Sequence, residues 1–570
     1  MILQALNDYY QRKTRLPDSG LAPPGFEHKA IPFVVVLTAA GDFAALEDTR
    51  EGEGKKRIAK SFLAPQTVKR SSGVAANLLW DNPGYVFGAD TKGKPERARE
   101  QHMAFVAAIR DRFASSSDAG IQAVLTFLDR GDFELVFAHP LWPEIRESGA
   151  NLTFRLEGDI CPVCEREAVV DALTADSRED AAATGLCLVS GTADVIERLH
   201  PSVKGVWGAQ TAGANIVSFN LDAFSSYGKA QGGNAPVGKR AAFAYTTALN
   251  HLLAKGSKQR IQVGDASTVF WAETPGHPME ELFPGFFSEP ARDDPDHGTQ
   301  AVAAWLAAPI TGADSFEDDG TRFYVLGLAP NAARIAVRFW HVKTVGELAV
   351  NIRRHFDDIR IIHAPHEPET LTLFRLLVAT ATQGKAENIP PNLGGDLMRS
   401  VIENLPYPQT LLAGAIRRIR AERQVTYPRA AIIKACLNRY SEMEELKMSL
   451  DENNTNAAYR LGRLFAVLER IQERASPNLN ATIRDRYYGA ASSTPMTVFS
   501  TLLKLKNHHI AKLDNKGEAV NLEKLIGQIM EGIDDFPAQL GLQDQGRFAI
   551  GYYHQRQAFF SKTDKSEQGE

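Results

Sequence analysis

The sequence has 570 residues, of which 44% are hydrophobic and 23% charged, and this composition excludes a mostly disordered chain. Its apolar runs, such as residues 33–37, are too short to cross a bilayer, and the polar opening MILQALNDYYQR is unlike a signal peptide. Four cysteines are too few for a disulfide framework. We therefore expect a cytoplasmic protein with no membrane segment.

Charge is unevenly distributed along the chain. The net charge is −5, yet residues 273–320 carry eleven acids and one base, which leaves the rest of the chain at about +5. Residues 50–70 hold seven bases against two acids, and residues 410–510 hold sixteen bases against nine acids. Two separate basic zones are typical of phosphate contacts, although solvated helix faces produce the same pattern.

The first 395 residues alternate strand and helix patterns. Three β-hairpins are predicted, each with two β-rich runs separated by a turn that contains Gly, Asp, Pro or Asn. The hairpins cover residues 33–48, 260–271 and 323–340, with turns at residues 40–42, 264–265 and 330–331.

Helices are predicted between and after these hairpins. Residues 240–255 have helical spacing and stop at a glycine, and residues 345–359 follow Thr344 as an N-cap. Residues 275–320 are rich in Pro, Gly and Asp, so we predict a long acidic excursion with one short helix at residues 302–307.

After residues 394–395 the strand patterns end and helical patterns follow one another. The predicted helix starts are Asp396, Thr410, Pro428, Asn456 and Thr494. A further helix is predicted over residues 522–530, and residues 456–475 place their apolar side chains on one stripe. The sequence therefore predicts an α+β fold, with a mixed α/β body of several β-hairpins over residues 1–395 and an all-α helical bundle over residues 396–570.

The motifs of common enzymes are absent from the sequence. No nucleophile elbow, zinc-protease helix or dinucleotide-binding glycine motif follows a predicted strand. The string Gly52-Glu-Gly-Lys-Lys56 resembles part of a phosphate-binding loop but lacks the Ser or Thr after the lysine. We interpret it as a basic turn or as a contact with a phosphate backbone.

Cys161-Pro-Val-Cys164 is the sharpest local motif. With Cys187 and His200 it would supply three sulfur ligands and one nitrogen ligand to zinc. A second closely spaced ligand pair is absent, so the sequence favours two unpaired thiols in a loop, and we predict no metal and no other cofactor. The alternative is an enzyme that depends on zinc or on the Cys161 and Cys164 thiols.

Basic and small polar residues gather just before Trp80. A basic pair supplies charge, two serines offer hydroxyls and backbone N–H groups at a predicted helix start, and an asparagine reaches toward a base edge. These residues are Lys69, Arg70, Ser71, Ser72 and Asn77. An ordinary capped helix above a buried Trp80 explains the same pattern.

A second candidate for nucleic-acid binding is glycine-rich. Its glycines let the backbone approach a ligand closely, and its amide side chains both donate and accept hydrogen bonds. The residues are Lys204, Gly205, Gly208, Gln210 and Asn215, with Trp207 expected in the core. A glycine-rich hairpin with no special role is the alternative.

Several long strings resemble one family. They are MILQALNDYY, LEDTREGEGKK from residue 46, VKRSSGVAANLLWDN from residue 68, KGVWGAQ from residue 204 and SFNLDAF from residue 218. They look like the large subunit of the type I-C CRISPR surveillance complex (Cascade), and the resemblance covers most of the chain.

The resemblance implies a DNA-recognition subunit that is not an enzyme. In such complexes the guide RNA supplies sequence specificity by pairing, while the large subunit recognises the protospacer-adjacent motif in double-stranded DNA, helps to form the R-loop and guides the displaced strand. The implied partners are the 5′ end of the guide RNA, the backbone and handle-binding subunits, the small subunit and the helicase-nuclease. A purely architectural RNA–protein subunit is the alternative.

On this interpretation, residues 1–395 recognise the flanking motif and dock into the complex. The two polar sets around residues 70 and 210 contact the duplex, with Gln210 as a wedge at the first opened base pair. The displaced single strand would follow a basic set on the C-terminal helices: Arg460, Arg463, Arg470, Arg474, Lys504 and Lys506.

The same resemblance implies a second product from this gene. Type I-C systems resemble one another in making the small subunit from an internal start within the large-subunit gene. We predict Met448 as that start, with Met443 as its competitor, so residues 448–570 would also be made separately.

Overall fold

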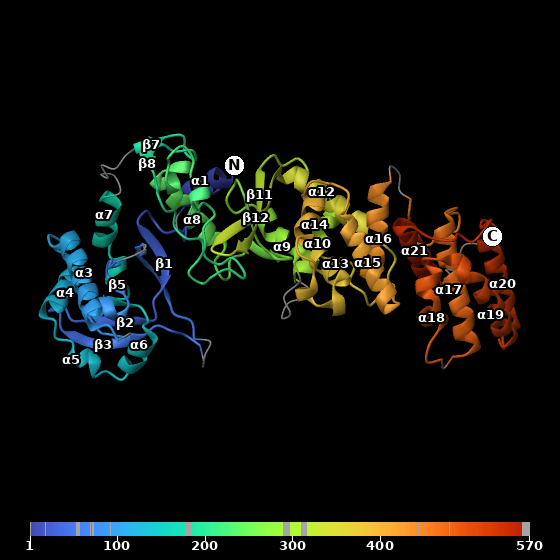
Figure 1. The fold of residues 1–570 in the computed structure, drawn as a ribbon, viewed down its shortest axis with the longest axis horizontal. Helices are drawn as coiled ribbons and strands as arrows, with labels where there is room; N and C mark the ends of the chain where they lie inside the picture. Colours follow the sequence, from blue (N-terminus) through green and yellow to red (C-terminus); the bar gives the residue numbers. More distant parts are fainter. Residues whose placement is uncertain are drawn as a thin grey trace. The chain divides into compact units, whose positions relative to one another are not determined.

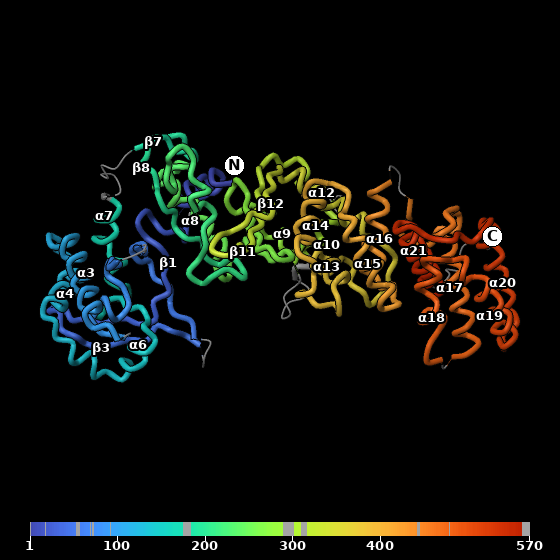
Figure 2. Tube along the Cα trace, viewed as in Figure 1, coloured from blue at the N-terminus to red at the C-terminus, as the bar shows by residue number. Residues whose placement is uncertain are grey.

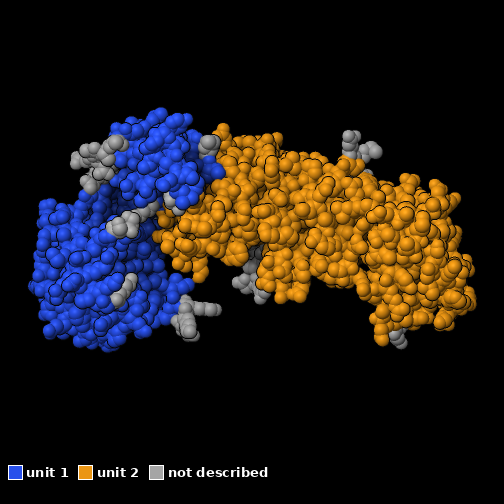
Figure 3. All heavy atoms as spheres, in the orientation of Figure 1, with its two compact units in different colours: residues 1–201, 217–251 blue, residues 202–216, 252–570 orange. Residues whose placement is uncertain are grey.

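A computed structural model describes residues 2–16, 19–52, 57–68, 70, 73–91, 93–176, 184–219, 221–288, 297–308, 316–441, 445–477 and 479–560. The chain forms two compact units, which Figure 3 distinguishes by colour. Unit 1 contains residues 1–201 and 217–251, and unit 2 contains residues 202–216 and 252–570. The short segment 202–216 therefore belongs to unit 2 although both of its flanks belong to unit 1.

Unit 1 is built on a four-stranded sheet with the order β3-β2-β6-β5 (Figure 1). Strand β2 is buried along its whole length because it lies between antiparallel β3 and parallel β6. The strands of this sheet are β2 (Phe33–Leu37), β3 (Phe43–Asp48), β5 (Trp80–Asp81) and β6 (Leu152–Leu156). The predicted hairpin at residues 33–48 is thus confirmed.

Helices and two small sheets complete unit 1, with α4 packed on β2 and β6. The helices are α1 (Ile2–Lys13), α2 (Pro83–Phe87), α3 (Pro95–Phe113), α4 (Ala119–Arg130), α5 (Glu134–Phe137), α6 (Trp142–Ser148), α7 (Glu167–Asp176) and α8 (Lys239–Leu252). The small sheets pair β1 (Phe26–Ala30) with β4 (Ser61–Pro65), and β7 (Thr184–Leu186) with β8 (Ala193–Val195). Helix α8 confirms the helix predicted over residues 240–255, although it ends at residue 252.

The predicted helix start near Ser71 is wrong. Among the described residues, 73–79 form a loop, and helix α2 begins only after Asn82. The side chain of Asn82 accepts a hydrogen bond from the backbone N–H of Gly84, and Pro83 suits the first helical turn. The true helix-start signal lies eleven residues downstream of Ser71, where an asparagine cap and a proline coincide.

Unit 2 begins with a four-stranded antiparallel sheet with the order β12-β11-β10-β9. Its strands are β9 (Arg260–Val263), β10 (Ala266–Ala272), β11 (Arg322–Asn331) and β12 (Arg334–Thr344). This sheet confirms the two remaining predicted hairpins. Helix α12 (Val345–Ile359) is also confirmed, and Thr344 and Glu347 form a capping box at its start.

The acidic excursion is more ordered than the sequence predicts. Helix α9 (Met279–Phe287) precedes helix α10 (His297–Leu306), which matches the one short helix expected in this stretch. Met279, Phe283 and Phe286 are buried in the core of unit 2. These apolar side chains have helical spacing, but the proline and the acidic residues around them indicated a loop. The sequence analysis therefore did not predict α9.

The rest of unit 2 is helical, which confirms the predicted change of character and the α+β class (Figure 1). The helices are α13 (Leu373–Thr380), α14 (Leu393–Ile402), α15 (Gln409–Glu422), α16 (Tyr427–Tyr440), α17 (Ala457–Ala475), α18 (Ile483–Ala491), α19 (Phe499–Ala511), α20 (Lys516–Met530) and α21 (Leu542–Ala558). None of the helices among the described residues is long and apolar enough to span a membrane.

Several predicted helix starts need correction by a few residues. Helix α14 begins after Asn392, so Asp396 lies in its first turn, and α15 begins at Gln409 rather than after Thr410. Pro495 opens a single 3-10 turn, and α19 follows it. Asn456 caps α17 as predicted, and its side chain accepts hydrogen bonds from two backbone N–H groups.

Helices α17 and α21 form the closest helix pair in the C-terminal part of unit 2 (Figure 2). A Cβ atom at Gly462 would overlap the carbonyl oxygen of Phe548, and one at Gly551 would overlap that of Tyr459. Only glycine permits such an approach of two backbones. The core of unit 2 runs continuously from the β-sheet into these helices, and the division of functions at residues 395/396 stays a prediction.

Candidate nucleic-acid interface

Residues 66–81, which we call loop 66–81, are held at their end by the carboxylate of Asp81. This side chain is 1% exposed and accepts hydrogen bonds from the backbone N–H groups of Asn77 (3.0 Å) and Asn82 (2.8 Å). It also pairs with the guanidinium of Arg70. Burial raises the pKa of Asp81, and the Arg70 charge together with the two N–H groups opposes that rise.

The predicted DNA contacts Arg70 and Asn77 are engaged within loop 66–81. Arg70 donates from Nε to the carbonyl of Ala75 (2.7 Å), and its guanidinium lies 4.0 Å from the ring centre of Tyr85. Asn77 is 3% exposed, and its Oδ1 accepts from the backbone N–H of Val68 (2.9 Å). Both side chains therefore hold the loop in shape.

The remaining members of this set, Lys69, Ser71 and Ser72, lie outside the described residues. Their contact with DNA stays a prediction, as does that of Arg70 and Asn77. Trp80 is buried, as the alternative interpretation expected, and its indole N–H donates to the carbonyl of Pro65 (2.9 Å).

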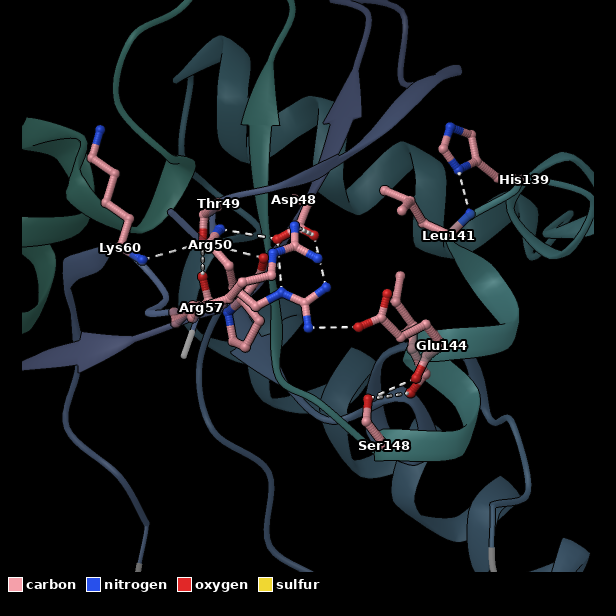
Figure 4. Close-up of polar contacts among 12 residues, drawn as sticks. Asp48, Thr49, Arg50, Arg57, Lys60, His139, Leu141, Glu144 and Ser148 are labelled. Carbon is pink, nitrogen blue, oxygen red and sulfur yellow. Dashed lines mark hydrogen bonds and ion pairs between the residues drawn. The ribbon is translucent and has the colours of Figure 1, made fainter. Parts of the chain in front are cut away.

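The other half of the first basic zone is anchored at Arg50 (Figure 4). Arg50 makes two hydrogen bonds to Asp48 (2.7 and 2.8 Å) and an ion pair with Glu144 (2.6 Å), and its guanidinium lies over the ring of Phe33. Arg57 pairs with the same aspartate. These hydrogen bonds and charges lower the pKa of Asp48 to about 2.

These contacts show that part of the basic zone at residues 50–70 is used for ion pairs within unit 1. Three of its seven bases, Arg50, Arg57 and Arg70, are paired with carboxylates inside unit 1. The hollow beside Arg50, about 230 Å³, is lined by three basic and three acidic side chains. A lining with equal numbers of positive and negative side chains does not attract an anion, so this hollow is not a phosphate site. The ion pairs around it stabilise unit 1 instead. Lys55 and Lys56 lie outside the described residues.

The second candidate, residues 203–214, forms a loop that is fixed through its backbone. We call it loop 203–214. Val203 and Ala214 exchange two backbone hydrogen bonds (2.8 and 2.9 Å) at its neck. A Cβ atom at Gly205 would lie 2.7 Å from the carbonyl oxygen of Leu253, and Gly205 has a φ of +88°. The backbone therefore packs too closely here for any other residue.

The predicted DNA contacts in and beside loop 203–214 differ in how exposed they are. Gln210 is exposed at the loop, and Lys204 and Asn215 are half-buried. Gly208 lies near the ring of Pro330, and the carbonyl of Asn215 accepts from the N–H of Ile335 (3.0 Å). The contact of this set with DNA stays a prediction. Trp207 was expected in the core, and this is wrong because its side chain is 62% exposed.

Two arginines of the predicted single-strand path, both on α17, form hydrogen bonds with neighbouring segments. Arg463 is 4% exposed, and its guanidinium donates to Gln555 (3.1 Å) and to the carbonyl of Glu452 (3.2 Å). Arg460 donates from Nε to the carbonyl of Asn454 (2.7 Å). These hydrogen bonds connect α17 to its neighbours and leave the Arg463 charge little access to a strand.

Other members of the set form ion pairs with α20. Arg474 makes two hydrogen bonds to Glu518 (2.7 and 2.8 Å), and Lys506 pairs with Glu523 (2.9 Å). Lys504 is exposed. The guanidinium of Arg470 lies near the rings of the terminal phenylalanines at 559 and 560. The path along these six residues stays a prediction.

Sequence reasoning overlooked a basic row on α15. Arg417, Arg420 and Arg423 follow one another at a spacing of three and are exposed. Within the described ranges, none of these three guanidinium groups forms an ion pair. The signal was present as an i, i+3 spacing, but the sequence does not say which bases of a helix meet carboxylates.

The thiols of the alternative enzyme site differ in their surroundings. At Cys187, burial is outweighed by hydrogen bonds from Ser190 and from nearby backbone N–H groups, so the pKa of this thiol is lowered. Burial raises the pKa of the Cys164 thiol to about 12, so it carries no thiolate at neutral pH. Cys161 is exposed, and the ring of His200 lies 2.6 Å from the hydroxyl of Tyr245. Among the residues that the structure describes, no three His, Cys, Asp or Glu side chains gather as metal ligands would.

These features define an α+β protein with basic, glycine-containing loops and a basic helical region. The family model described as CRISPR-associated protein (Cas_Csd1) matches residues 6–560. The chain therefore belongs to this family, the large subunits of type I-C CRISPR surveillance complexes, and the resemblance seen in the sequence is confirmed. A comparison with curated proteins finds no match.

Proposed function

We propose that this chain is the non-enzymatic subunit that recognises the protospacer-adjacent motif in double-stranded DNA, helps to open the duplex and guides the displaced strand. Loop 203–214 is the observation that carries the proposal, because its backbone is fixed while Gln210 stays exposed. A loop that is already ordered loses little conformational entropy on binding, which suits recognition of base edges. The guide RNA supplies the remaining specificity by pairing.

Loop 66–81 contributes a second contact in this proposal. Asp81 and Asn77 fix the backbone at Val68 and Asn77 and the side chain of Arg70, and we propose that Lys69, Ser71 and Ser72 contact phosphates from this segment. Phosphate contacts position a protein on a duplex without reading its sequence. We assign base-edge contact to Gln210 of loop 203–214, a phosphate contact to Lys204 of the same loop, and further phosphate contacts to loop 66–81.

The partners that we propose are those expected of a large subunit in this family. They are the 5′ end of the guide RNA, the backbone and handle-binding subunits, the small subunit, and the helicase-nuclease that acts on the opened target. The internal start at Met448 belongs to the same proposal. Met448 lies in the loop before α17, and helices α17, α19, α20 and α21 pack together.

The test of DNA recognition uses the assembled complex. Gln210→Ala and Lys204→Ala should weaken binding of a target with an intact flanking duplex, while assembly on guide RNA is unchanged. Gln528→Ala is the matched control, because Gln528 is an exposed glutamine on α20. Losing one phosphate contact at Lys204 should lower the salt dependence of binding by about one unit of log K against log salt. Normal binding by both variants would remove the assignment.

Crosslinking separates recognition from architecture. A photo-crosslinker at position 210 should capture the flanking duplex of the target in the assembled complex. Capture of guide RNA or of a neighbouring subunit alone would favour the architectural alternative.

The internal start has its own test. Expression of the unaltered gene should give a second product of about 120 residues, a length suited to one helical domain. Met448→Leu should abolish that product and leave the full chain in place. A second product that persists would point to another start, and no second product from the unaltered gene would end the idea.

A further inference from the structure

Trp207 is unlike the buried tryptophans of this chain. Its side chain is 62% exposed, whereas Trp80 is 1% exposed and Trp271 is wholly buried. Its backbone N–H donates to the hydroxyl of Ser267 on β10 (2.9 Å), so the residue is attached to the sheet of unit 2. A large apolar ring held in water on a fixed support is typical of a surface that binds something.

The loop that carries this ring has little freedom. The N–H of Ala209 donates to the carbonyl of Val206 (3.1 Å), and that of Gly213 donates to the carbonyl of Gln210 (2.9 Å). Two turns therefore lie within the neck closed by Val203 and Ala214. The exposed side chains of Trp207 and Gln210 therefore belong to one short, braced loop.

The three segments that meet at loop 203–214 contain more basic than acidic residues. Three segments of unit 2 meet here, because Gly205 packs on Leu253 and Gly208 packs on Pro330. Residues 202–216, 252–265 and 329–338 contain a single acid, Asp265, and it already pairs with Arg338 (2.7 Å). The bases of these segments are Lys204, Lys255, Lys258, Arg260, Arg334 and Arg338.

An exposed indole on a loop that meets predominantly basic segments fits one chemical class best. Positive charge attracts a phosphate backbone, and the face of an indole stacks on a nucleobase that has lost its own neighbour. An apolar protein partner would not need the lysines and arginines. An intact duplex would not expose the face of a nucleobase. The combination therefore fits a nucleic acid at the point where its stacking is interrupted.

We propose that Trp207 stacks on the first unpaired base of the target DNA beside the flanking duplex, next to Gln210. This deepens the proposed function, because it assumes that loop 203–214 meets that duplex. Stacking tolerates any base, so Trp207 stabilises the opened state without selecting the motif. In this proposal Gln210 contacts a base edge, and Trp207 stacks on the opened base.

The experiment places 2-aminopurine at the first opened position and uses the assembled complex. Stacking on indole quenches the fluorescence of this base, so the wild type and Trp207→Phe should quench it and Trp207→Ala should not. Affinity should fall roughly tenfold in Trp207→Ala, the equivalent of about 1.4 kcal/mol for one lost base stack. Leu135→Ala is the control, because Leu135 is an exposed apolar residue of unit 1.

A second target, with mismatches that open the same base pairs in advance, makes the outcome decisive. Quenching that is equal in the wild type and Trp207→Ala on this target would overturn the stacking role. If Gln210→Ala and Lys204→Ala weaken binding while Trp207→Ala does not, the stacking inference fails and the proposed function stands. If none of the three changes binding, the proposed function fails at this loop. Loss of a protein subunit from the Trp207→Ala complex would assign the ring to a protein interface and overturn the inference.

Discussion

Loop 66–81 and loop 203–214 were both predicted to contact DNA, but their polar groups are used in opposite ways. In loop 66–81 the side chains of Arg70, Asn77 and Asp81 bind one another and the backbone. In loop 203–214 backbone groups and glycines hold the structure, and Gln210 and Trp207 stay exposed. A polar residue in a basic loop is therefore a candidate contact only once its internal partners are known.

The largest effect is expected from removing the anchor of loop 66–81. Asp81→Ala leaves two buried N–H groups and the Arg70 guanidinium without their acceptor, which should destabilise unit 1 by about 3 kcal/mol. Asp81→Asn should cost less because it keeps one acceptor oxygen. Thermal unfolding and limited proteolysis measure both variants. Equal stability of Asp81→Ala and the wild type would contradict the scaffold role.

In loop 203–214 the corresponding weak point is the backbone. Gly205→Ala puts a Cβ atom 2.7 Å from a backbone oxygen and should destabilise the loop by about 2 kcal/mol. Gly208→Ala is the matched control, because it also has a positive φ but its nearest neighbour lies at 3.5 Å. Hydrogen exchange at the loop should distinguish the two. A larger effect at Gly208 would show that backbone conformation, rather than contact with Leu253, sets the shape.

Acid should act on buried histidines elsewhere in unit 2 rather than on loop 203–214. Residues 202–216 contain no Asp, Glu or His, whereas burial lowers the pKa of His355 and of His554 in unit 2 to about 3. These histidines are neutral in the fold and take up protons on unfolding, so their stabilising effect is complete above pH 6.5 and is lost as pH falls from 6.5 toward 3.

Each of these histidines should contribute about 1.4 kcal/mol of lost stability per pH unit in that window. His355→Gln and His554→Gln should therefore flatten the dependence of melting temperature on pH. His508→Gln, which changes an exposed histidine, is the control. An unchanged slope in both buried variants would mean that other groups govern the acid response.

The smallest effect concerns the displaced strand. If the displaced strand binds to exposed arginines that form no ion pair, changing Arg417, Arg420 and Arg423 together to Gln should weaken that binding. The salt dependence of single-strand binding should then fall by up to about one unit of log K against log salt per contact. Arg474→Gln should have less effect on binding, because that arginine already pairs with Glu518. Electrophoretic shifts at several salt concentrations measure both. The reverse ranking would restore the predicted path along α17.

Much of the fold was predictable because its signals are local. The hairpin at residues 260–271 follows from two β-rich runs around a turn, and helix α12 follows from Thr344 and Glu347, which cap it together. Helix α9 was missed because it is stable only through burial of its phenylalanines against the sheet of unit 2. The candidate site was predictable as two loops, but the roles of their residues were not.

The sequence by itself determined the class, the three hairpins, most of the C-terminal helices and the family, since these depend on composition, periodicity and long matching strings. Only the tertiary structure decided that Arg463 is buried, that Asn77 holds a backbone and that Trp207 faces water. Burial and pairing depend on which distant segments meet, such as residues 203–214 with 253 and 330. No single stretch of sequence contains that information, because the partners of a side chain come from elsewhere in the chain.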